Sequence, residues 1–424
     1  MLDIKFIREN KDLIIKNSQD RLSTVDINTL LRADEKYRHL LGQIEELRAK
    51  RNQGSKNKPS QAEIAAMKDV GDLISSLEDE VRVVEGEVHQ LLLSVPNLAH
   101  ADVKRSDNEE DNPVLETVGT IPKLNFAPKD HVELAESLDL VDFERGTKVA
   151  GAKFYYLKNE LALLSLALNQ YVLHIVMKHG YKFMITPDVA RNSIIEGLGF
   201  NPRGESSQVY QLESQDLGLV GTSEITLGGY HSEEVLALEK LPIKYVGLSH
   251  CFRTEAGAYS KFSKGIFRVH QFEKIEMFIY AVPDQAESLH QEMLEIEKEI
   301  FSGLGIPFRV VDHCTADLGA PSYRTFDLEA WLLGKPNKEG GAGDWAEITS
   351  TSNCTDYQSR SLNIKYVNKE GKKELVYTLN GTANPGVRAL IAIMENYQQA
   401  DGSIKIPEVL IPYMNGVKII QKTS

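Results

Sequence analysis

Two heptad repeats in the first hundred residues constrain the fold of this chain most strongly. Apolar residues alternate three and four positions apart between residues 30 and 47, and again between residues 67 and 91. This spacing puts them on one stripe of each helix, as in a coiled-coil seam. A glycine and a proline, Gly54 and Pro59, separate the two runs and end one helix before the next begins. The sequence therefore predicts an antiparallel helical hairpin over about residues 28–95, projecting as an arm. The first run is Leu30, Ala33, Tyr37, Leu40, Ile44 and Leu47, and the second is Met67, Val70, Ile74, Leu77, Val81, Val84, Val88 and Leu91.

The tip of the predicted arm is basic. Its cations lie in a stretch without a single acidic residue, and they are Arg48, Lys50, Arg51, Lys56 and Lys58. Such a cluster can neutralise the phosphates of a nucleic-acid backbone. It can also simply keep an exposed tip soluble, and the arm can alternatively serve as a dimerisation device.

Composition and charge narrow the class of protein. Hydrophobic residues make up 42% and charged residues 26% of the 424 residues, which is ordinary for a globular protein. The net charge of −13 argues against indiscriminate binding to nucleic acids or anionic membranes. We see no apolar stretch of the roughly 20 residues that span a membrane and no signal peptide, so we expect a cytoplasmic protein without a membrane partner. Three scattered cysteines argue against a disulfide framework and a structural zinc site.

The rest of the chain predicts an α+β domain. An acidic, polar linker at residues 102–113 separates two predicted domains, 1–105 and 106–424. Apolar patterns predict helices over residues 154–179 and 283–300. Successive strand-like runs argue for an antiparallel β-sheet flanked by helices, and no Rossmann or P-loop glycine motif is present. These runs cover residues 208–212, 218–225, 245–255, 266–282, 325–332, 346–351 and 376–380.

Polar residues recur at even spacing within these runs, so they are predicted to share one face of the sheet. The pairs are Thr222 with Glu224, Arg253 with Glu255 and Glu347 with Thr349, and a longer series holds Arg268, His270, Phe272, Lys274 and Glu276. The face is either a solvated sheet surface or a polar cleft, and the repetition favours a cleft. Arginine matches phosphate and carboxylate oxygens, an aromatic ring can stack on a purine, and carboxylates can hold Mg²⁺. This inventory fits phosphoryl or nucleotidyl transfer better than covalent catalysis.

Several of these segments also resemble one family. CFRTEAGAYSKFSKGIFRVHQFEKIEMF resembles motif 2 of the class II aminoacyl-tRNA synthetases, LNGTANPGVRALIAIMENYQ resembles motif 3, and HGYKFMITP resembles motif 1 at the dimer interface. GTSEI is similar to a serine-binding element, and DWAEITSTSN to a metal and ATP segment. In this order behind a coiled-coil arm, they make the chain resemble bacterial-type seryl-tRNA synthetases over nearly its full length.

The resemblance implies a homodimer with a class II catalytic domain. Serine and ATP would give seryl-adenylate, and the seryl group would pass to the 3′ end of tRNA(Ser), bound by the arm tip and the motif 2 loop. It implies that the catalytic residues are Arg253, Glu255 and Arg388. The serine-binding residues would be Thr222, Ser223, Glu224, Arg253, Glu276 and Thr382. The ATP-binding residues would be Arg253, Thr254, Glu255, Arg268, Val269, Phe272, Glu347, Ile348, Thr349, Ser350 and Arg388. Mg²⁺ would be held by Glu347 and Ser350.

The sequence departs from the family pattern in three places. Val387 stands directly before Arg388, where motif 3 usually has a glycine. The motif 2 loop carries residues 261–265 as Lys-Phe-Ser-Lys-Gly, and residues 333–345 read as an unusually long, glycine-rich surface loop. Two alternatives to a serine–tRNA ligase stay open: a paralogue that charges another acceptor, and a catalytically silent paralogue kept as a dimeric interaction protein.

Overall fold

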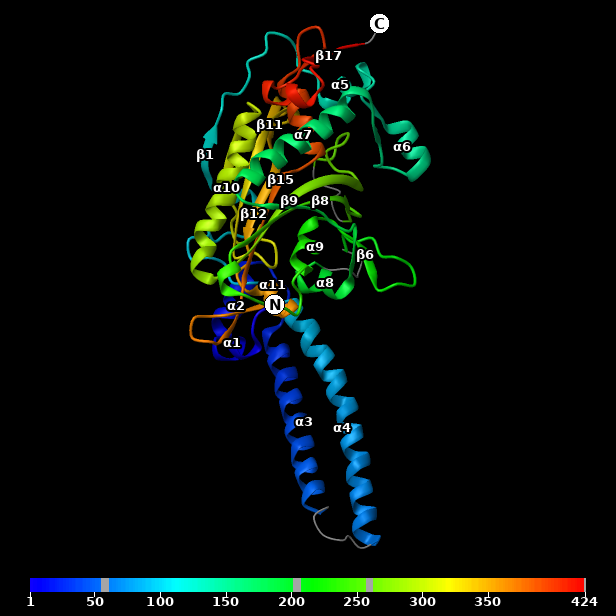
Figure 1. Ribbon diagram of the computed structural model, residues 1–424, viewed down its shortest axis with the longest axis vertical. Helices are drawn as coiled ribbons and strands as arrows, with labels where there is room; N and C mark the ends of the chain where they lie inside the picture. Colours follow the sequence, from blue (N-terminus) through cyan, green and yellow to red (C-terminus); the bar gives the residue numbers. More distant parts are fainter. Residues whose placement is uncertain (55–60, 201–206, 257–261, 423–424) are drawn as a thin grey trace. The chain divides into compact units, whose positions relative to one another are not determined.

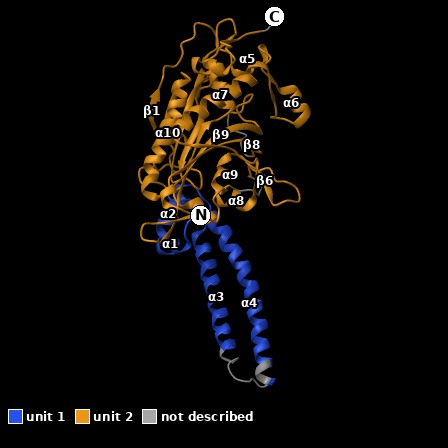
Figure 2. Cartoon of the chain, in the orientation of Figure 1, with its two compact units in different colours: residues 1–98 blue, residues 99–424 orange. Residues whose placement is uncertain are grey.

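The computed structural model describes residues 1–54, 61–200, 207–256 and 262–422. Its chain forms two compact units, residues 1–98 and 99–424 (Figure 2). Lys56 and Lys58 of the predicted basic tip, and Lys261 of the motif 2 loop, lie outside the described residues.

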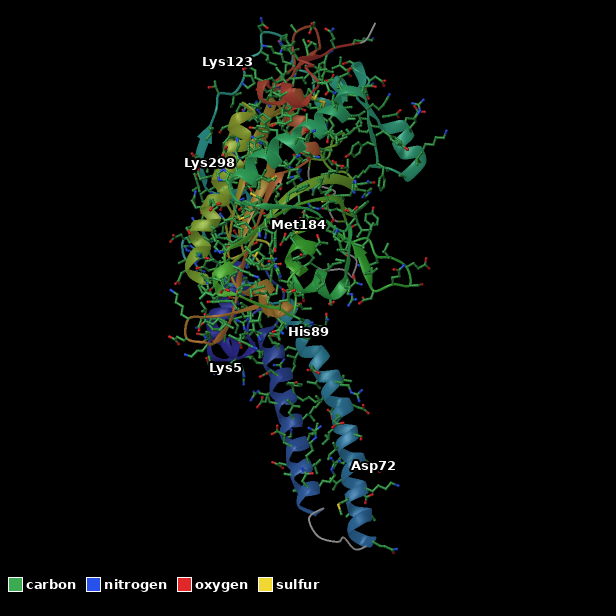
Figure 3. The ribbon with its side chains drawn as sticks, in the orientation of Figure 1. Lys5, Asp72, His89, Lys123, Met184 and Lys298 are labelled. Atoms are coloured by element: carbon green, nitrogen blue, oxygen red, sulfur yellow. The ribbon has the colours of Figure 1, made fainter. Side chains whose placement is uncertain are left out.

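The first unit is the predicted helical hairpin with two short helices before it (Figure 1). These are α1 (Ile4–Glu9) and α2 (Lys11–Asp20), followed by the long helices α3 (Ile27–Gly54) and α4 (Gln61–Leu93). Seven of the fourteen predicted seam residues are buried, including Leu30, Ile44 and Val84, and the other seven are partly buried. Asp72 and His89 on α4 are exposed outside it (Figure 3). The heptad prediction is confirmed.

The second unit is built on a sheet that, among the described residues, has eight strands in the order β1-β10-β11-β12-β15-β9-β8-β4. All neighbouring strands are antiparallel except β4 and β8, which run parallel. The predicted α+β class with an antiparallel sheet is therefore confirmed. The strands are β1 (Val114–Val118), β4 (Lys182–Ile185), β8 (Ile243–Phe252), β9 (Gln271–Ala281), β10 (Phe308–Asp312), β11 (Arg324–Pro336), β12 (Ala342–Asn353) and β15 (Tyr377–Asn384).

Helices and short strand pairs surround this sheet. The helices are α5 (His131–Ser137), α6 (Phe143–Ala150), α7 (Asn159–Lys178), α8 (Asn192–Gly197), α9 (Ser223–Gly229), α10 (Ala286–Gly303), α11 (Tyr357–Leu362) and α12 (Val387–Asn396). Small strand pairings join β2 (Val141–Asp142) to β3 (Tyr156–Leu157), β5 (Val189–Arg191) to β6 (Leu217–Leu219), β7 (Val235–Leu236) and β14 (Lys373–Leu375) to β13 (Lys365–Val367), and β16 (Ile404–Lys405) to β17 (Ile419–Ile420).

A large hydrophobic core covers one face of the sheet and a smaller core covers part of the other, where the pocket described below lies. On β9, Met277 and Ile279 enter the large core formed with α7, α10 and α12. Their neighbours Phe278 and Tyr280 point to the opposite face and pack in a smaller core with α8 and α9. Because side chains alternate along a strand, Lys274 and Glu276 of β9 lie on the face of the smaller core. That face is left open where the small core ends.

Helix α7 bears on two predictions. It begins at Asn159 and not at Phe154, because the chain first forms β3. By length and composition α7 is apolar enough to cross a membrane, contrary to our sequence analysis. Half of its most apolar window is buried, and Leu161, Leu164 and Val172 belong to the large core, so α7 is a core helix of this unit.

Residues 333–345 are not a long surface loop. Residues 333–336 continue β11 and residues 342–345 open β12, so only a short turn joins the two strands. Gly343 has a φ of +89° and lies against the Trp331 ring, which explains one of the glycines as a packing requirement.

Candidate active site

A pocket opens on the polar face of the sheet, within the second unit. Its wall comes from the end of β8, from β9, β12 and β15, and from the start of α12. The lining residues are Arg253, Glu255, Phe267, Arg268, Val269, Phe272, Lys274, Glu347, Ile348, Ser350, Thr382, Pro385, Val387 and Arg388. Ten of these fourteen were singled out from the sequence as site residues. Of the other four, Lys274 was predicted only to share the polar face, and Phe267, Pro385 and Val387 were not predicted as site residues.

Three guanidinium groups reach this pocket. Arg253 follows β8 directly, donates from Nε to the backbone oxygen of Gly221 at 3.3 Å, and lies 5.3 Å from the Phe272 ring. Arg268 is 3.1 Å from the carboxylate of Glu255, so this pair is tied together before any ligand binds. Arginine side chains that line one pocket can together bind several oxygen atoms of one polyphosphate.

The third arginine, Arg388, sits at the first turn of α12. Its guanidinium lies 3.0 Å from the Glu347 carboxylate and over the ring of Phe267, at 4.8 Å from the ring centre. Desolvation alone would raise the pKa of Glu347, but the positive charges of Arg388, His313 and Arg253 hold that pKa below its usual value.

The floor of the pocket is a buried polar network. Glu276 is 2% exposed and accepts hydrogen bonds or ion contacts from the Lys274 ammonium at 2.6 Å and the Thr382 hydroxyl at 3.2 Å. All three side chains lie on one sheet face, because Thr382 is directly paired with Glu276 in the register. The predicted common face of Lys274 and Glu276 is thus confirmed, since β9 is regular there.

Glu224 lies behind this floor on helix α9. Its Oε1 accepts from Gln358 Nε2 at 2.8 Å and from Asn380 Nδ2 at 3.2 Å. Burial, reinforced by the nearby negative charge of Glu276, raises the pKa of Glu224 to about 7. A carboxyl of this kind is poorly compensated by neutral amides, and it is suited to receive a cation.

Thr222 and Glu224 do not form the strand pair that we predicted. Thr222 is the N-cap of α9 and its hydroxyl accepts the Glu224 N–H at 3.2 Å. A threonine that caps the next turn is a helix-start signal, and it was overlooked because the preceding residues alternate like a strand. Ser223 is fully buried and donates to the Gly247 backbone oxygen at 3.0 Å, away from the pocket.

Glu347 and Thr349 do not share a face either. The pairing of β11 with β12 shifts between Leu328 and Glu329, so β12 carries one extra residue, a β-bulge. The bulge turns Thr349 towards α10, where its hydroxyl donates to Glu297 at 2.7 Å. Glu347 and Ser350 instead both line the pocket.

The remaining predicted residues are placed as follows. Val269 and Ile348 line the pocket as largely buried apolar residues. The Thr254 hydroxyl donates to the Ser207 backbone oxygen at 2.7 Å and is not part of the pocket wall. Glu255 has a φ of +53°, a strained backbone of the kind that clusters at functional sites.

Oxygen donors are available for a hard cation. Glu347 offers a carboxylate and Ser350 a hydroxyl on the same side of β12, which suits Mg²⁺ bridging to substrate phosphates. Within the described part of the chain, no three His, Cys, Asp or Glu side chains gather as a metal site. A cation here would therefore take most of its ligands from substrate and water.

Motif 3 fits its surroundings through Gly386. Its φ is +59°, and a Cβ at this position would lie 2.1 Å from the Glu273 backbone oxygen. Val387, which stands where the family pattern usually has a glycine, is the first residue of α12; it is 5% exposed, packs in the large core and also lines the pocket. Glycine is needed one residue earlier than the family pattern suggested.

The described part of the arm tip is also on the surface. Lys50 and Arg51 are exposed on α3. Arg48 is half exposed but pairs with Glu78 of α4 at 2.8 Å. Its charge is therefore partly neutralised within the hairpin.

The antiparallel sheet, with arginines and an aromatic ring on its open face, is the core of a class II aminoacyl-tRNA synthetase. Residues 208–397 match the tRNA synthetase class II core domain (G, H, P, S and T), and residues 1–99 match the seryl-tRNA synthetase N-terminal domain. A protein of Treponema denticola described as serine–tRNA ligase is 51% identical over 97% of this chain and 98% of its own length. The chain belongs to the seryl-tRNA synthetase family.

Solved structures agree with this assignment. Seryl-tRNA synthetase from Pyrococcus horikoshii, complexed with ATP, is 35% identical with a TM-score of 0.87 over 100% of both chains. The cytoplasmic serine–tRNA ligase of Naegleria fowleri, in complex with AMP, is 32% identical with a TM-score of 0.85, over 100% of this chain and 99% of its own.

Proposed function

We propose that the chain activates L-serine with ATP and transfers the seryl group to the 3′ end of tRNA(Ser). The observation that carries this proposal is the pocket itself. It has three guanidinium groups and an aromatic ring on its wall, and buried carboxyl and hydroxyl groups at its floor. These two parts match the two substrates of adenylate formation.

ATP occupies the wall in this proposal. The Phe272 ring stacks on adenine, Arg253 contacts the α-phosphate and the serine carboxylate, and Arg268 and Arg388 hold the outer phosphates. Glu255, Val269 and Ile348 border the nucleotide. Thr254 and Thr349 contribute backbone only, because their side chains lie outside the pocket wall and bond to Ser207 and Glu297. Arg253 stabilises the charge that develops at the α-phosphorus, so catalysis rests mainly on positioning and electrostatics. Mg²⁺ would be held by Glu347 and Ser350, and it supplies charge neutralisation at the phosphates.

Serine occupies the floor. The Glu224 and Glu276 carboxyl groups receive its ammonium and hydroxyl groups together with Thr382, while Thr222 and Ser223 shape the start of α9 behind them. A floor that hydrogen-bonds a hydroxyl rejects alanine, because the buried polar groups would then lose a partner. No structural zinc enters this scheme.

The arm tip and the motif 2 loop bind the tRNA. Arg48, Lys50, Arg51, Lys56 and Lys58 contact its backbone, mostly without reading bases. We also propose a cytoplasmic homodimer. Its support is an apolar surface on α7 and the edge strand β4, where Leu166 is 57%, Met177 52% and Ile185 78% exposed. An exposed apolar edge strand of this kind is normally covered by a partner.

Two variants test the proposal step by step. Arg253→Ala should abolish serine-dependent ATP–pyrophosphate exchange while the circular dichroism spectrum stays native. Normal exchange by this variant would sink the assignment of the pocket.

The second test concerns the arm. Replacing Lys50 and Arg51 by glutamate should raise the KM for tRNA roughly tenfold, because each lost phosphate contact weakens binding. Adenylate formation should stay unchanged. The same charge change at Lys5 and Lys11, exposed on α1 and α2, is the matched control. If both double variants act alike, the tip has no special role.

A further inference from the structure

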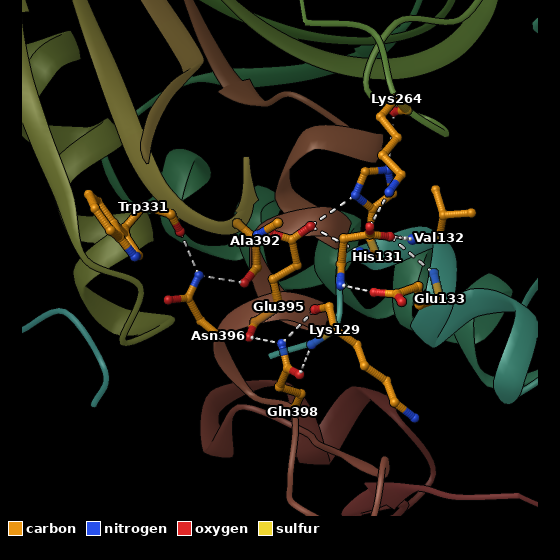
Figure 4. Close-up of polar contacts among 12 residues, drawn as sticks. Lys129, His131, Val132, Glu133, Lys264, Trp331, Ala392, Glu395, Asn396 and Gln398 are labelled. Carbon is orange, nitrogen blue, oxygen red and sulfur yellow. Dashed lines mark hydrogen bonds and ion pairs between the residues drawn. The ribbon is translucent and has the colours of Figure 1, made fainter. Parts of the chain in front are cut away.

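A buried polar cluster lies behind the pocket, where the end of α12 meets the start of α5 (Figure 4). His131 and Glu395 are each 1% exposed, and His131 Nδ1 lies 2.9 Å from Glu395 Oε1. The carboxylate also accepts the backbone N–H of His131 at 3.0 Å and that of Gly334, on β11, at 2.8 Å. Both of its oxygen atoms thus have donors, as a buried carboxylate requires.

The cluster reaches the pocket through one carbonyl group. His131 Nε2 lies 3.2 Å from the backbone oxygen of Lys264, and this oxygen also accepts the Phe267 N–H at 3.1 Å. Both ring nitrogens of His131 thus lie within hydrogen-bonding distance of oxygen atoms. The Lys264 ammonium also pairs with Asp130, the residue before His131. The turn that leads to Phe267 is therefore fastened to α5.

The series of contacts that starts at Glu395 ends at Arg388, on the same helix. Phe267 packs under the guanidinium of Arg388, 4.8 Å from the ring centre. Arg388 and Glu395 lie on the same helix, α12, about two turns apart. The ring that supports the arginine is thus held, through the Lys264 carbonyl and His131, by a carboxylate of the arginine's own helix.

Two glycines show how closely these parts approach. A Cβ on Gly265, which has a φ of +57°, would lie 2.4 Å from His131 Nε2. A Cβ on Gly334 would lie 2.4 Å from the Cβ of Asp130 and 2.7 Å from Glu395 Oε1. The cluster is therefore so closely packed that a shift of the turn at 264–267 would break contacts.

We propose that His131 and Glu395 are positioning residues for ATP. They fix the ring of Phe267 and, through it, the direction in which Arg388 enters the pocket. Neither residue touches the substrate. The inference rests on the proposed function, since Arg388 is assigned to the outer phosphates there.

Two substitutions at His131 separate positioning from simple structural support. An asparagine amide lies near the place of Nδ1 and keeps the contact to Glu395, whereas a glutamine amide lies near Nε2 and keeps the contact to the Lys264 carbonyl. His131→Asn should weaken ATP binding roughly tenfold, because small misplacements in a site are costly. His131→Gln should stay within about threefold of the wild type. The KM for serine should change little in either variant.

ATP affinity is measured by titration calorimetry without serine, and the KM values for ATP and serine by pyrophosphate exchange. If the role is only to satisfy the buried carboxylate, His131→Asn will match the wild type and His131→Gln will not, which overturns the proposal. Equal increases in both KM values overturn it as well. If the wild-type protein binds ATP but activates no serine, the proposed function is contradicted. The ATP affinities of the two His131 variants would still test the positioning role of His131.

Asp130→Asn covers the case in which the His131 variants do not fold. Its remaining oxygen still accepts the Val132 and Glu133 N–H groups that cap α5, so the fold should persist. The new amide cannot pair with Lys264, and ATP affinity should fall about threefold, as expected for an ion pair whose lysine end is half exposed. Unchanged affinity contradicts the proposal. His179→Asn, which alters an exposed contact to Glu299 at 2.7 Å, is the matched control.

Discussion

Serine binding by this enzyme should depend steeply on pH, because the buried carboxyl of Glu224 has a pKa of about 7. The ammonium group of serine needs an ionised partner. A carboxyl with this pKa is about nine-tenths ionised at pH 8 and about one-tenth at pH 6. Lowering the pH across this range should therefore raise the Kd and the KM for serine about tenfold. The KM for ATP serves as an internal control and should change far less.

Calorimetry in buffers of different ionisation enthalpy gives a second readout. Near pH 7 about half of the Glu224 carboxyl groups carry a proton in the free enzyme, so serine binding should release about half a proton. A serine Kd that is flat between pH 6 and pH 8, with no proton release, would refute the reasoning. It would mean that Glu224 is ionised before serine arrives, or that it does not meet the ammonium group.

Three further predictions follow from the same structure. Burial raises the pKa of Glu224 from 4.5 in the unfolded chain to about 7 in the folded state. The stabilisation that this shift contributes is complete below pH 4.5 and is lost as the pH rises through 7. Glu224→Gln should therefore raise the free energy of unfolding at pH 8 by up to about 3 kcal/mol in urea melts, and it should abolish pyrophosphate exchange. An unchanged free energy of unfolding would argue against the raised pKa of Glu224. Gly386→Ala places a Cβ 2.1 Å from the Glu273 backbone oxygen at a φ of +59°, and should cost at least about 2 kcal/mol in the same melts. If the chain forms the proposed dimer, Ile185→Asp should convert it to a monomer in light scattering, and a persistent dimer would place the interface elsewhere.

Regular periodicity explains what the sequence could predict. The heptad residues of the arm are all buried or partly buried, because both long helices keep an unbroken turn. Lys274 and Glu276 share a face because β9 is a regular strand. In both cases, a local pattern determined the direction of each side chain.

Irregular backbone explains what it could not predict. One extra residue in β12 separates Glu347 from Thr349, and a bulge has no signature in the alternation of residue types. Glu224 and its partner Gln358 are 134 positions apart in the chain, so only the folded structure brings them together. The contact between His131 and Glu395 likewise spans 264 positions.

The assignment of the serine site depends most on whether the protein selects serine over the other amino acids. Pyrophosphate exchange with ATP, measured across all twenty amino acids without tRNA, tests it directly. Exchange is expected with serine and at most weakly with alanine, whose missing hydroxyl leaves Thr382 and Glu276 without their proposed partner. Exchange driven better by another amino acid, or none at all from folded protein, would contradict it.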